Sequence, residues 1–414
     1  MDYRAMVNPT YLTAKSTLFM LAGAGYEDAK RIIGALGTQD EMRKNAAKDN
    51  GGKSLLSDKD RKELFAGTTT AIVARYEAVS RFMLKEGYTN LFDIACGYTP
   101  RSIYCARADI DYVGVDVPVV AEELERLAQK IGLSQKHPTY MGADATNAAS
   151  LTAAASLLQG AVLISCEGLA LYLYAEEFEQ LLGGIREVLL QHGGTWITSD
   201  MGVDYEAFAT TCMSDPDAVK LYRKAKKAAM SSSNVYEDGV TFWDEGRKQA
   251  FIEAHGFRVE KVPFYDGDED LATLRDIPET WKNALKMKLN ESRLWVMTVD
   301  EDFKGSQMIE GAKQVENLSI DYTKKGGVLQ CRVNGRIDTI SAPALLEVFA
   351  KNYDGTASIM VDAGELEYIS SAGLRVLLMA VKKLGADSVT VCNTSDAVKE
   401  IFETTGFDQL ITVR

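Results

Sequence analysis

The stretch that decides the fold is NLFDIACGYTPRSIYCA, residues 90–106. It begins with a short apolar run, which predicts a buried strand, and passes through Gly97 into a helical pattern. Four further strands are predicted at DYVGVD, TYMGAD, AVLISCE and TWITSD, with helical segments such as VVAEELERLAQKIG between them. Alternation of strand and helix at this spacing is typical of a parallel, doubly wound α/β sheet.

The flanking sequence predicts two domains. The chain before the sheet carries helical periodicity, which predicts a helical cap, and the apolar strands RVEKVPFYD and RLWVMTVD end the sheet near residue 300. A polar, aromatic-poor segment then precedes two strands around the Gly326-Gly327 turn, followed by alternating helices and strands. The predicted organisation is a first domain at 1–300 (cap 1–87, core 88–300), a linker at 301–316 and a small α/β domain at 317–414.

The composition excludes several classes of protein. The 46 Lys and Arg against 59 Asp and Glu give a net charge of −13, whereas nucleic-acid binding needs a basic face. No apolar run approaches the ~20 residues of a membrane span, and the N-terminus does not have the pattern of a signal peptide. The six cysteines lack metal-ligand spacing and are typical of reduced thiols. We therefore expect a cytoplasmic protein with no metal site and neither a nucleic-acid nor a membrane partner.

Acidic residues stand at successive strand ends, where doubly wound sheets bind their ligands. Gly97 lets the backbone approach a ligand, and Asp116 is placed to accept both hydroxyls of a ribose. Asp144 and Ala145 are placed to receive an adenine amino group, and Glu167 follows the fourth strand. The set predicts an adenosine-containing ligand. Asp200, after the fifth strand, is typical of a helix N-cap.

The turn also indicates which adenosine-containing ligand is expected. A dinucleotide site needs G-x-G-x-x-G, whereas this turn reads A-C-G-Y-T-P and keeps only Gly97. An acidic lining repels phosphates and favours a cation. S-adenosyl-L-methionine carries a sulfonium and an ammonium group and no phosphate, so the acids suit it.

The motifs FDIACGYTPRSIYCA, YVGVDVPVV, GAD and CEGLALYL resemble the leucine carboxyl methyltransferase-like branch of the class I S-adenosylmethionine-dependent methyltransferases, over about residues 60 to 300. The resemblance implies a Rossmann-like methyltransferase domain. It implies that Arg75 acts on carboxylates of cofactor or substrate and that Tyr172 contacts the substrate, so these two are the expected catalytic residues. The expected cofactor contacts are Asp93, Ala95, Gly97, Asp116, Asp144, Ala145 and Glu167. Ala95 replaces the family's first glycine, and Thr99-Pro100 stands where Asp-Thr is usual.

The histidines indicate the type of methyl acceptor. His137, His192 and His255 each precede a predicted strand, and are therefore expected at the amino ends of the strands, opposite the ligand site. A hydroxyl acceptor usually needs a general base, most often His, whereas a carboxylate needs none. The pattern favours a small-molecule or other carboxylate acceptor, or an already acidic hydroxyl.

The C-terminal unit resembles the STAS domain of anti-sigma factor antagonists along nearly all its length. NGRIDTISAPAL and YISSAGLRVLL carry the resemblance. It implies that Ser371 is phosphorylated, with Ser370 as the alternative, and that Asp338 faces a serine kinase or anti-sigma factor. The residue-based alternative for these serines is simple N-capping of a helix.

Three functions stay open on the sequence. The first is a bacterial S-adenosylmethionine-dependent O-methyltransferase coupled to a phosphorylation-regulated STAS module. The second is a non-catalytic sensor of S-adenosylmethionine or another small ligand, which the altered turn at Ala95 favours. In the third, the STAS module serves only for docking or for dimerisation into a homodimer. The sequence does not specify the methyl acceptor.

Overall fold

The structure is a computed structural model of the chain. It describes residues 8–37, 56–132, 137–232, 240, 243–267, 270–303, 309–385 and 387–414. The chain divides into two compact units. The first comprises Met1–Leu173, Gly183–Glu237 and Glu260–Thr298, and the second comprises Tyr174–Leu182, Asp238–Val259 and Val299–Arg414. No described helix combines the length and the apolarity that a bilayer span requires.

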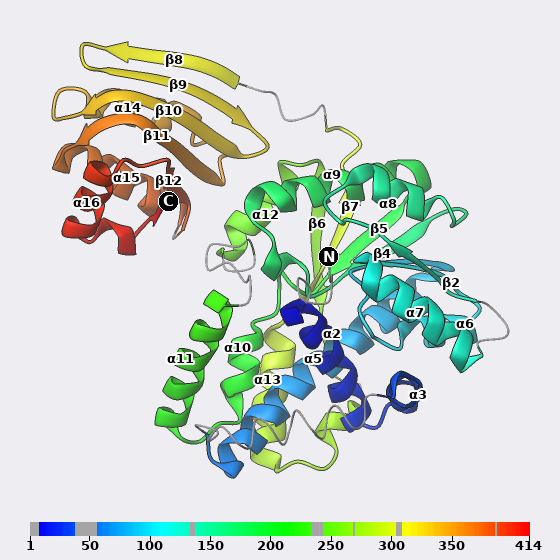
Figure 1. The fold of residues 1–414 in the computed structure, drawn as a ribbon. Coiled ribbons are helices and arrows are strands. Elements are labelled where there is room, and N and C mark those ends of the chain that lie inside the picture. The colour runs from blue at the N-terminus through cyan, green and yellow to red at the C-terminus, as the bar shows by residue number, and fades with distance from the viewer. Residues whose placement is uncertain are drawn as a thin grey trace. The chain divides into compact units, whose positions relative to one another are not determined.

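A seven-stranded sheet forms the centre of the first unit, with the strand order β3-β2-β1-β4-β5-β7-β6 (Figure 1). Strands β1 to β5 are parallel, and β7 is antiparallel to β5. The residues of β1 and β4 are all buried, as expected for a parallel sheet covered on both faces. The predicted doubly wound sheet is therefore confirmed. The strands are β1 Asn90–Ile94, β2 Asp111–Asp116, β3 Thr139–Gly142, β4 Val162–Cys166, β5 Gly194–Thr198, β6 Phe257–Pro263 and β7 Arg293–Val299.

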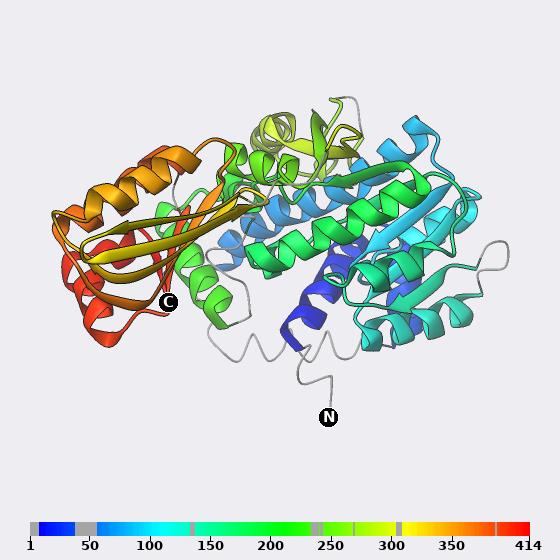
Figure 2. The same cartoon turned by 90° about the horizontal axis from the view of Figure 1, so that it is seen from above.

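Helices connect and cover this sheet, and the predicted N-terminal helices are present. The longest is α5, drawn in blue in Figures 1 and 2, which starts at a capping box of Ser57 and Asp60 and ends at Gly87 in a left-handed conformation. It packs against α2 and α10. The helices are α2 Asn8–Gly23, α3 Glu27–Leu36, α5 Asp58–Glu86, α6 Arg101–Arg107, α7 Pro118–Ile131, α8 Ala148–Ala155, η1 Ala170–Tyr172, α9 Ala175–His192, α10 Tyr205–Thr211, α11 Pro216–Ser232, α12 Glu245–Glu253, η3 Ala272–Leu274 and α13 Glu279–Glu291.

The second unit is built around a six-stranded sheet with the order β13-β12-β11-β10-β9-β8. The predicted Gly-Gly turn joins β9 to β10, with φ of +57° at Gly326 and +76° at Gly327. Alternate residues of the central strands share one buried core with α14, α15 and α16. The elements are β8 Ile309–Val315, β9 Leu318–Lys325, β10 Val328–Ile337, α14 Ala342–Asn352, β11 Ser358–Ile369, α15 Ser371–Leu384, β12 Val389–Cys392, α16 Asp396–Thr405, η4 Phe407–Gln409 and β13 Thr412–Val413.

The segment 301–316 differs from the prediction of a linker. Its second half forms the strand β8, which pairs antiparallel with β9 along the edge of the sheet. None of the residues 310–315 is buried, so this edge strand carries no apolar pattern that would distinguish it from a linker. The hydrogen bonds to β9 hold it in place instead.

Substitution of Gly373, in the first turn of α15, tests how closely this helix packs on the sheet of the second unit. A Cβ at this position would lie 2.5 Å from Ile337 Cγ2 and 2.7 Å from Ile369 Cγ1. We expect Gly373→Ala to lower the free energy of unfolding by about 1–3 kcal/mol, because the helix must move away from the sheet. Denaturant unfolding measures the change. Gly183→Ala, at an exposed helical position with open space around the Cβ, is the control and should not destabilise. Equal stability of Gly373→Ala and the unchanged chain would contradict this packing.

Candidate functional site

A cavity of about 740 Å³ lies at the carboxyl ends of β1 to β4. Its wall also includes residues of α5 and of the turn around η1. The structure brings together in this wall all nine residues that the sequence singled out in the first unit: Arg75, Asp93, Ala95, Gly97, Asp116, Asp144, Ala145, Glu167 and Tyr172. What each residue binds stays a prediction. The size suits a small molecule.

Asp116, in the cavity wall, connects the carboxyl ends of β1 and β2. Its Oδ2 accepts a hydrogen bond from Gly97 N at 2.9 Å, and its Oδ1 accepts one from Val117 N at 2.8 Å. Burial raises the pKa of the Asp116 carboxyl, and these two amides oppose that rise. The carboxylate therefore fixes the glycine turn, and each oxygen keeps a further lone pair for a ligand.

Ala95 adopts a conformation that alanine rarely tolerates. Its φ is +54°, in the left-handed region, and Gly97 follows at +53°. A Cβ in this region costs roughly 1–2 kcal/mol. The turn therefore keeps a glycine-like backbone at Ala95, where the resemblance expected a glycine.

Replacement of Ala95 by glycine tests this strain. We expect Ala95→Gly to raise the free energy of unfolding by about 0.5–1 kcal/mol, since relief of the left-handed Cβ exceeds the entropy lost by glycine. Thermal or denaturant unfolding measures it. Ala225→Gly in the exposed middle of α11 is the matched control and should destabilise by about 1 kcal/mol. A loss of stability in Ala95→Gly comparable to that of the control would show that the turn is not strained.

A buried ionic network forms part of the cavity wall. Asp93 accepts hydrogen bonds from the hydroxyls of Ser165 at 2.6 Å and Tyr112 at 3.1 Å. Arg101, which is 2% exposed, donates to Glu167 Oε2 at 3.1 Å, and its Nε lies 3.8 Å from Asp93 Oδ2. Burial raises the pKa of Glu167, and Arg101 counteracts this. The arginine thus keeps two acidic strand ends together in the fold.

The position of Asp200 after the fifth strand predicted that it caps the following helix, and this prediction is wrong. The N-cap of α10 is Asp204. The Asp200 carboxylate instead accepts hydrogen bonds from the amides of Gly168 at 2.8 Å, Leu169 at 3.2 Å and Ala170 at 3.4 Å. It holds the turn that leads from Glu167 to η1, a role that no local sequence signal indicates.

Arg75 reaches the same turn from α5. A Cβ on Gly168 would lie 3.4 Å from an Arg75 guanidinium nitrogen, and the guanidinium carbon lies 5.7 Å from the centre of the Tyr205 ring. Burial by itself would lower the pKa of Arg75, but Tyr205, Glu167 and Asp200 raise it above its usual value. The guanidinium therefore stays charged in the cavity wall.

Tyr205 and Ser199 form a support that the sequence did not indicate. The Ser199 hydroxyl donates to Glu167 Oε1 at 3.0 Å and lies 2.9 Å from the Tyr205 hydroxyl. Burial raises the pKa of Tyr205 to about 12. Glu167 is thus held from one side by Arg101 and from the other by Ser199.

The charges in the cavity wall are unequal. Four carboxylates, from Asp93, Asp116, Asp144 and Glu167, face two guanidiniums, from Arg75 and Arg101. Asp144 is exposed and accepts hydrogen bonds from the amide and the hydroxyl of Thr146. A surplus of acid in the cavity wall favours a cationic ligand.

The three histidines lie at the amino ends of strands, as predicted. His137 precedes β3, His192 ends α9 before β5, and His255 precedes β6. The ring of His137 contacts Pro138 O, and that of His255 contacts Phe251 O. Among the described residues that line the cavity, none is a histidine.

The second candidate site lies at the start of α15. Ser370 is the N-cap, and its hydroxyl accepts a hydrogen bond from Gly373 N at 3.4 Å. Ser371 is the first helical residue and is exposed. The two serines therefore differ, since the first is engaged in the fold and the second presents its side chain to solvent.

The loop of Asp338 lies next to these serines, because Ser370 N donates to Ile337 O at 2.8 Å. Hydrogen bonds from the amides of Ser341 and Ile340 lower the pKa of Asp338. Ile340 is 78% exposed, which is unusual for a large apolar side chain. The sequence had indicated Asp338 on this surface but not Ile340.

Comparison with known proteins identifies the C-terminal part. Residues 319–414 match the family model of the STAS domain. BtrV of Bordetella bronchiseptica, whose name describes an anti-sigma factor antagonist, is 33% identical over 93 residues, which cover 22% of this chain and 80% of BtrV. The anti-sigma-B factor antagonist of Staphylococcus aureus (strain NCTC 8325) is 30% identical over 100 residues, which cover 23% of this chain and 93% of that protein.

Solved structures resemble both parts of the chain. An anti-sigma factor antagonist from Mycobacterium paratuberculosis matches with a TM-score of 0.20 and 24% identity, covering 26% of this chain and 85% of its own. The magnesium protoporphyrin IX methyltransferase of Synechocystis PCC 6803, solved with bound SAH, matches with a TM-score of 0.34 and 14% identity, covering 67% of this chain and 96% of its own. Methyltransferases are thus among the structural neighbours of the N-terminal region.

Proposed function

Because the chain belongs, through its C-terminal STAS domain, to the family of the anti-sigma factor antagonists, we propose that it couples a partner-switching module to an S-adenosylmethionine-dependent methyltransferase. In this proposal residues 1–300 form the methyltransferase domain and residues 317–414 form the STAS domain. The observation that supports the methyltransferase part of the proposal is the cavity at the strand ends. Nine residues that were selected from the sequence line it.

The cofactor fits this cavity by charge and by position. S-adenosylmethionine is a cation without phosphate, and the wall holds four carboxylates against two guanidiniums. Asp116 would accept the ribose hydroxyls, Asp144 and Ala145 would receive the adenine amino group, and Gly97 would allow the backbone to approach. Glu167, between Arg101 and Ser199, would face the methionine part. When bound, the cofactor supplies an activated methyl group on sulfur.

The acceptor is a carboxylate or an acidic hydroxyl. When bound, the cofactor would supply the methyl group that the acceptor oxygen takes up, and S-adenosylhomocysteine would be the demethylated product. Arg75 would orient an acceptor carboxylate, and Tyr172 would contact the rest of the substrate. A carboxylate needs no general base, which agrees with the position of the histidines at the opposite strand ends.

In this proposal, phosphorylation of Ser371 controls whether the STAS domain binds its partner. A phosphate on this exposed first residue of α15 would be tolerated by the positive end of the helix and would add roughly two negative charges. The partner is a serine kinase-like anti-sigma factor that docks over Ser371 and Asp338, and the added charge would expel a partner surface that carries acids. Ile340 would supply the apolar part of the docking surface.

A non-catalytic sensor is the second candidate, and one observation favours it. Ala95 keeps the left-handed backbone at φ +54° with a strained Cβ, so the turn is shaped for binding without the glycine of the enzyme family. In that case ligand binding would regulate the STAS partner, with no methyl transfer.

Calorimetry separates these two functions. The full chain is titrated with S-adenosylmethionine and with S-adenosylhomocysteine, and is then incubated with S-adenosylmethionine and a panel of carboxylic and hydroxylic acceptors. Binding with methyl transfer to a carboxylate supports the enzyme, and binding without turnover across the panel supports the sensor. If neither cofactor form binds, both functions of the first unit are wrong.

A further inference from the structure

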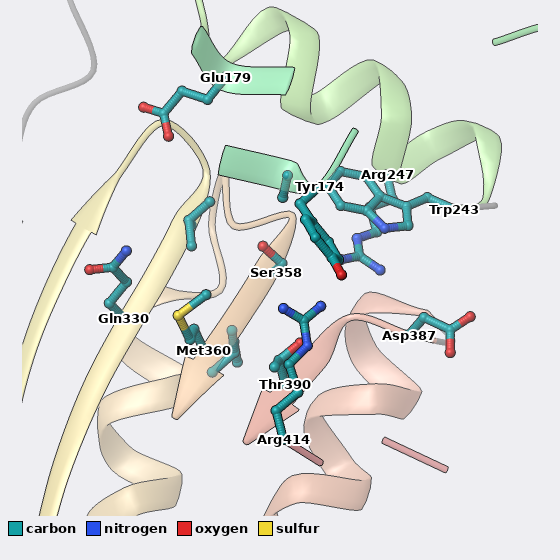
Figure 3. A pocket seen from close by; sticks show the side chains of 13 residues that line it. Tyr174, Glu179, Trp243, Arg247, Gln330, Ser358, Met360, Asp387, Thr390 and Arg414 are labelled. Carbon is teal, nitrogen blue, oxygen red and sulfur yellow. The ribbon is translucent and has the colours of Figure 1, made fainter. Parts of the chain in front are cut away.

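A second, smaller cavity, of about 50 Å³, lies in the second unit. Its wall holds two guanidiniums and two carboxylates, from Arg247, Arg414, Glu179 and Asp387 (Figure 3). Because these charges balance, this cavity has no preference for an anionic or a cationic ligand. The cavity of the first unit is larger and carries a surplus of acid, and a buried lysine contacts one of the side chains in its wall.

This lysine is Lys15, on the N-terminal helix α2. It is 7% exposed, which is unusual for a lysine unless it is paired. Its Nζ lies 3.9 Å from Glu123 Oε2 on α7 and 5.2 Å from the centre of the Tyr98 ring. The Tyr98 hydroxyl donates a hydrogen bond to the same oxygen, Glu123 Oε2. The ammonium is thus held by a carboxylate and by the aromatic ring that binds this carboxylate.

The cluster of Lys15, Tyr98 and Glu123 joins three elements of the first unit beside the cavity. Tyr98 is fully buried in the cavity wall and directly follows Gly97, whose amide donates to Asp116. Glu123 belongs to α7, which begins two residues after Asp116. Two residues after Lys15, Thr17 of α2 also lines the cavity. The cluster therefore connects α2 and α7 to the glycine turn at one part of the wall.

The helix α2 is also held by contacts that do not involve Lys15. Leu18 and Leu21 are fully buried, and α2 packs against α3 and α5. Lys15→Met keeps the apolar stem of the lysine, so it leaves these contacts in place and removes the ammonium. The substitution therefore separates the connection to the glycine turn from the packing of the helix.

We propose that Lys15 is a positioning residue for the ligand of this cavity, which holds α2 against the glycine turn through Tyr98 and Glu123. The ligand then dissociates slowly, because Thr17 stays in the cavity wall and the turn stays fixed. The inference rests on the proposed function, since it assumes that the cavity binds S-adenosylmethionine. It goes beyond that function by giving the N-terminal helix a role in retaining the cofactor.

The test measures the affinity and the dissociation rate of S-adenosylhomocysteine on the immobilised full chain by surface plasmon resonance. Lys15→Met should weaken binding about threefold to tenfold, mainly through faster dissociation. Lys15→Arg keeps the cation and should bind within about twofold of the unchanged chain. Lys30→Met is the matched control, because Lys30 is an exposed lysine of α3 that pairs with Glu27, and it should bind like the unchanged chain.

A double variant shows whether Lys15 acts through the cluster. Neither Lys15 nor Glu123 lines the cavity, so both act on the ligand through other residues. If they act as one pair, Lys15→Met combined with Glu123→Gln should bind no more weakly than Lys15→Met alone. Losses that multiply in the double variant would overturn the inference. Thermal unfolding checks that each variant is folded at the temperature of the measurement.

Hydrogen exchange supplies a readout that needs no ligand. The amides of Cys96 and Gly97 donate to Val115 O and to Asp116. In Lys15→Met they should exchange faster than in the unchanged chain, whereas in Lys30→Met they should not. Unchanged affinity in Lys15→Met would overturn the inference. If the unchanged chain does not bind the probe, the proposed function fails, and the exchange measurement alone then decides whether Lys15 holds the turn.

Discussion

Replacement of Arg101 by methionine will lower the free energy of unfolding by about 3–5 kcal/mol, because it leaves two buried carboxylates without their cation. Arg101 is 2% exposed and is the only guanidinium in the described chain that an ion pair joins to both Asp93 and Glu167. Methionine nearly fills the volume but cannot donate a hydrogen bond. Denaturant unfolding of the full chain, followed by circular dichroism, measures the loss.

The control for this prediction lies at the other end of the same helix. Arg107 is largely exposed and pairs with Asp28, so Arg107→Met should cost at most about 1 kcal/mol. Equal losses in the two variants would contradict the buried network.

The pH dependence of Arg101→Met follows from Glu167. Burial raises the pKa of Glu167 and Arg101 opposes that rise, so the variant raises it further. A carboxyl with a raised pKa in the folded state binds more protons when folded, and stability then falls as pH increases through that pKa. The deficit of Arg101→Met should therefore be smallest in acid and should grow toward neutral pH.

From the proposed function we expect replacement of Ser371 by alanine to abolish phosphorylation of the STAS domain by a serine kinase, whereas Ser370→Ala should leave it intact. The Ser371 side chain is exposed at the first position of α15, and the Ser370 hydroxyl is engaged with Gly373 N. The test incubates the full-length variants with ATP and a lysate of the native cells, and locates the phosphate by mass spectrometry.

In unfolding measurements, Ser370→Ala should lower the free energy of unfolding more than Ser371→Ala, although only Ser371→Ala should affect phosphorylation. Ser370→Ala removes the helix cap and should cost about 1 kcal/mol, whereas Ser371→Ala should cost little. A chain that is phosphorylated on Ser370, or only outside both serines, would contradict the assignment. Loss of phosphate in both variants would show that the cap is also needed for recognition by the kinase.

Much of the fold could be predicted because its signals are local. Each of the strands β1, β2 and β4 is a short, largely apolar run with an acid at its carboxyl end: Asp93 is the next-to-last residue of β1, Asp116 is the last residue of β2, and Glu167 directly follows β4. In a parallel sheet these strand ends meet at one edge, so spacing along the chain is enough to bring Asp116 and Glu167 to one cavity. The Gly326-Gly327 turn is likewise a local signal.

The supports of the site could not be predicted because they act over long distances in the chain. Asp200 binds the amides of a turn 30 to 32 residues before it, and Arg101 reaches Glu167 over 66 residues. Nothing in the neighbouring residues of either one indicates its partner. The strand β8 was missed for a different reason, since its exposed edge position needs no apolar pattern.

Ala95 shows where local rules and the structure diverge. Sequence alone indicates that alanine replaces a glycine of the turn, but not whether the backbone changes or the strain is accepted. The φ of +54° shows that Ala95 keeps the left-handed backbone that a glycine would adopt. Asp116 fixes this turn by accepting a hydrogen bond from Gly97 N. Tertiary hydrogen bonds thus override the local preference of the residue.

A crystal structure of the full chain with S-adenosylhomocysteine tests the central claim most directly. The account predicts the ligand in the cavity at the ends of β1 to β4, with its ribose hydroxyls on Asp116, its adenine at Asp144 and Ala145, and its amino acid part facing Glu167. A ligand bound elsewhere, or one whose ribose does not contact Asp116, would contradict it.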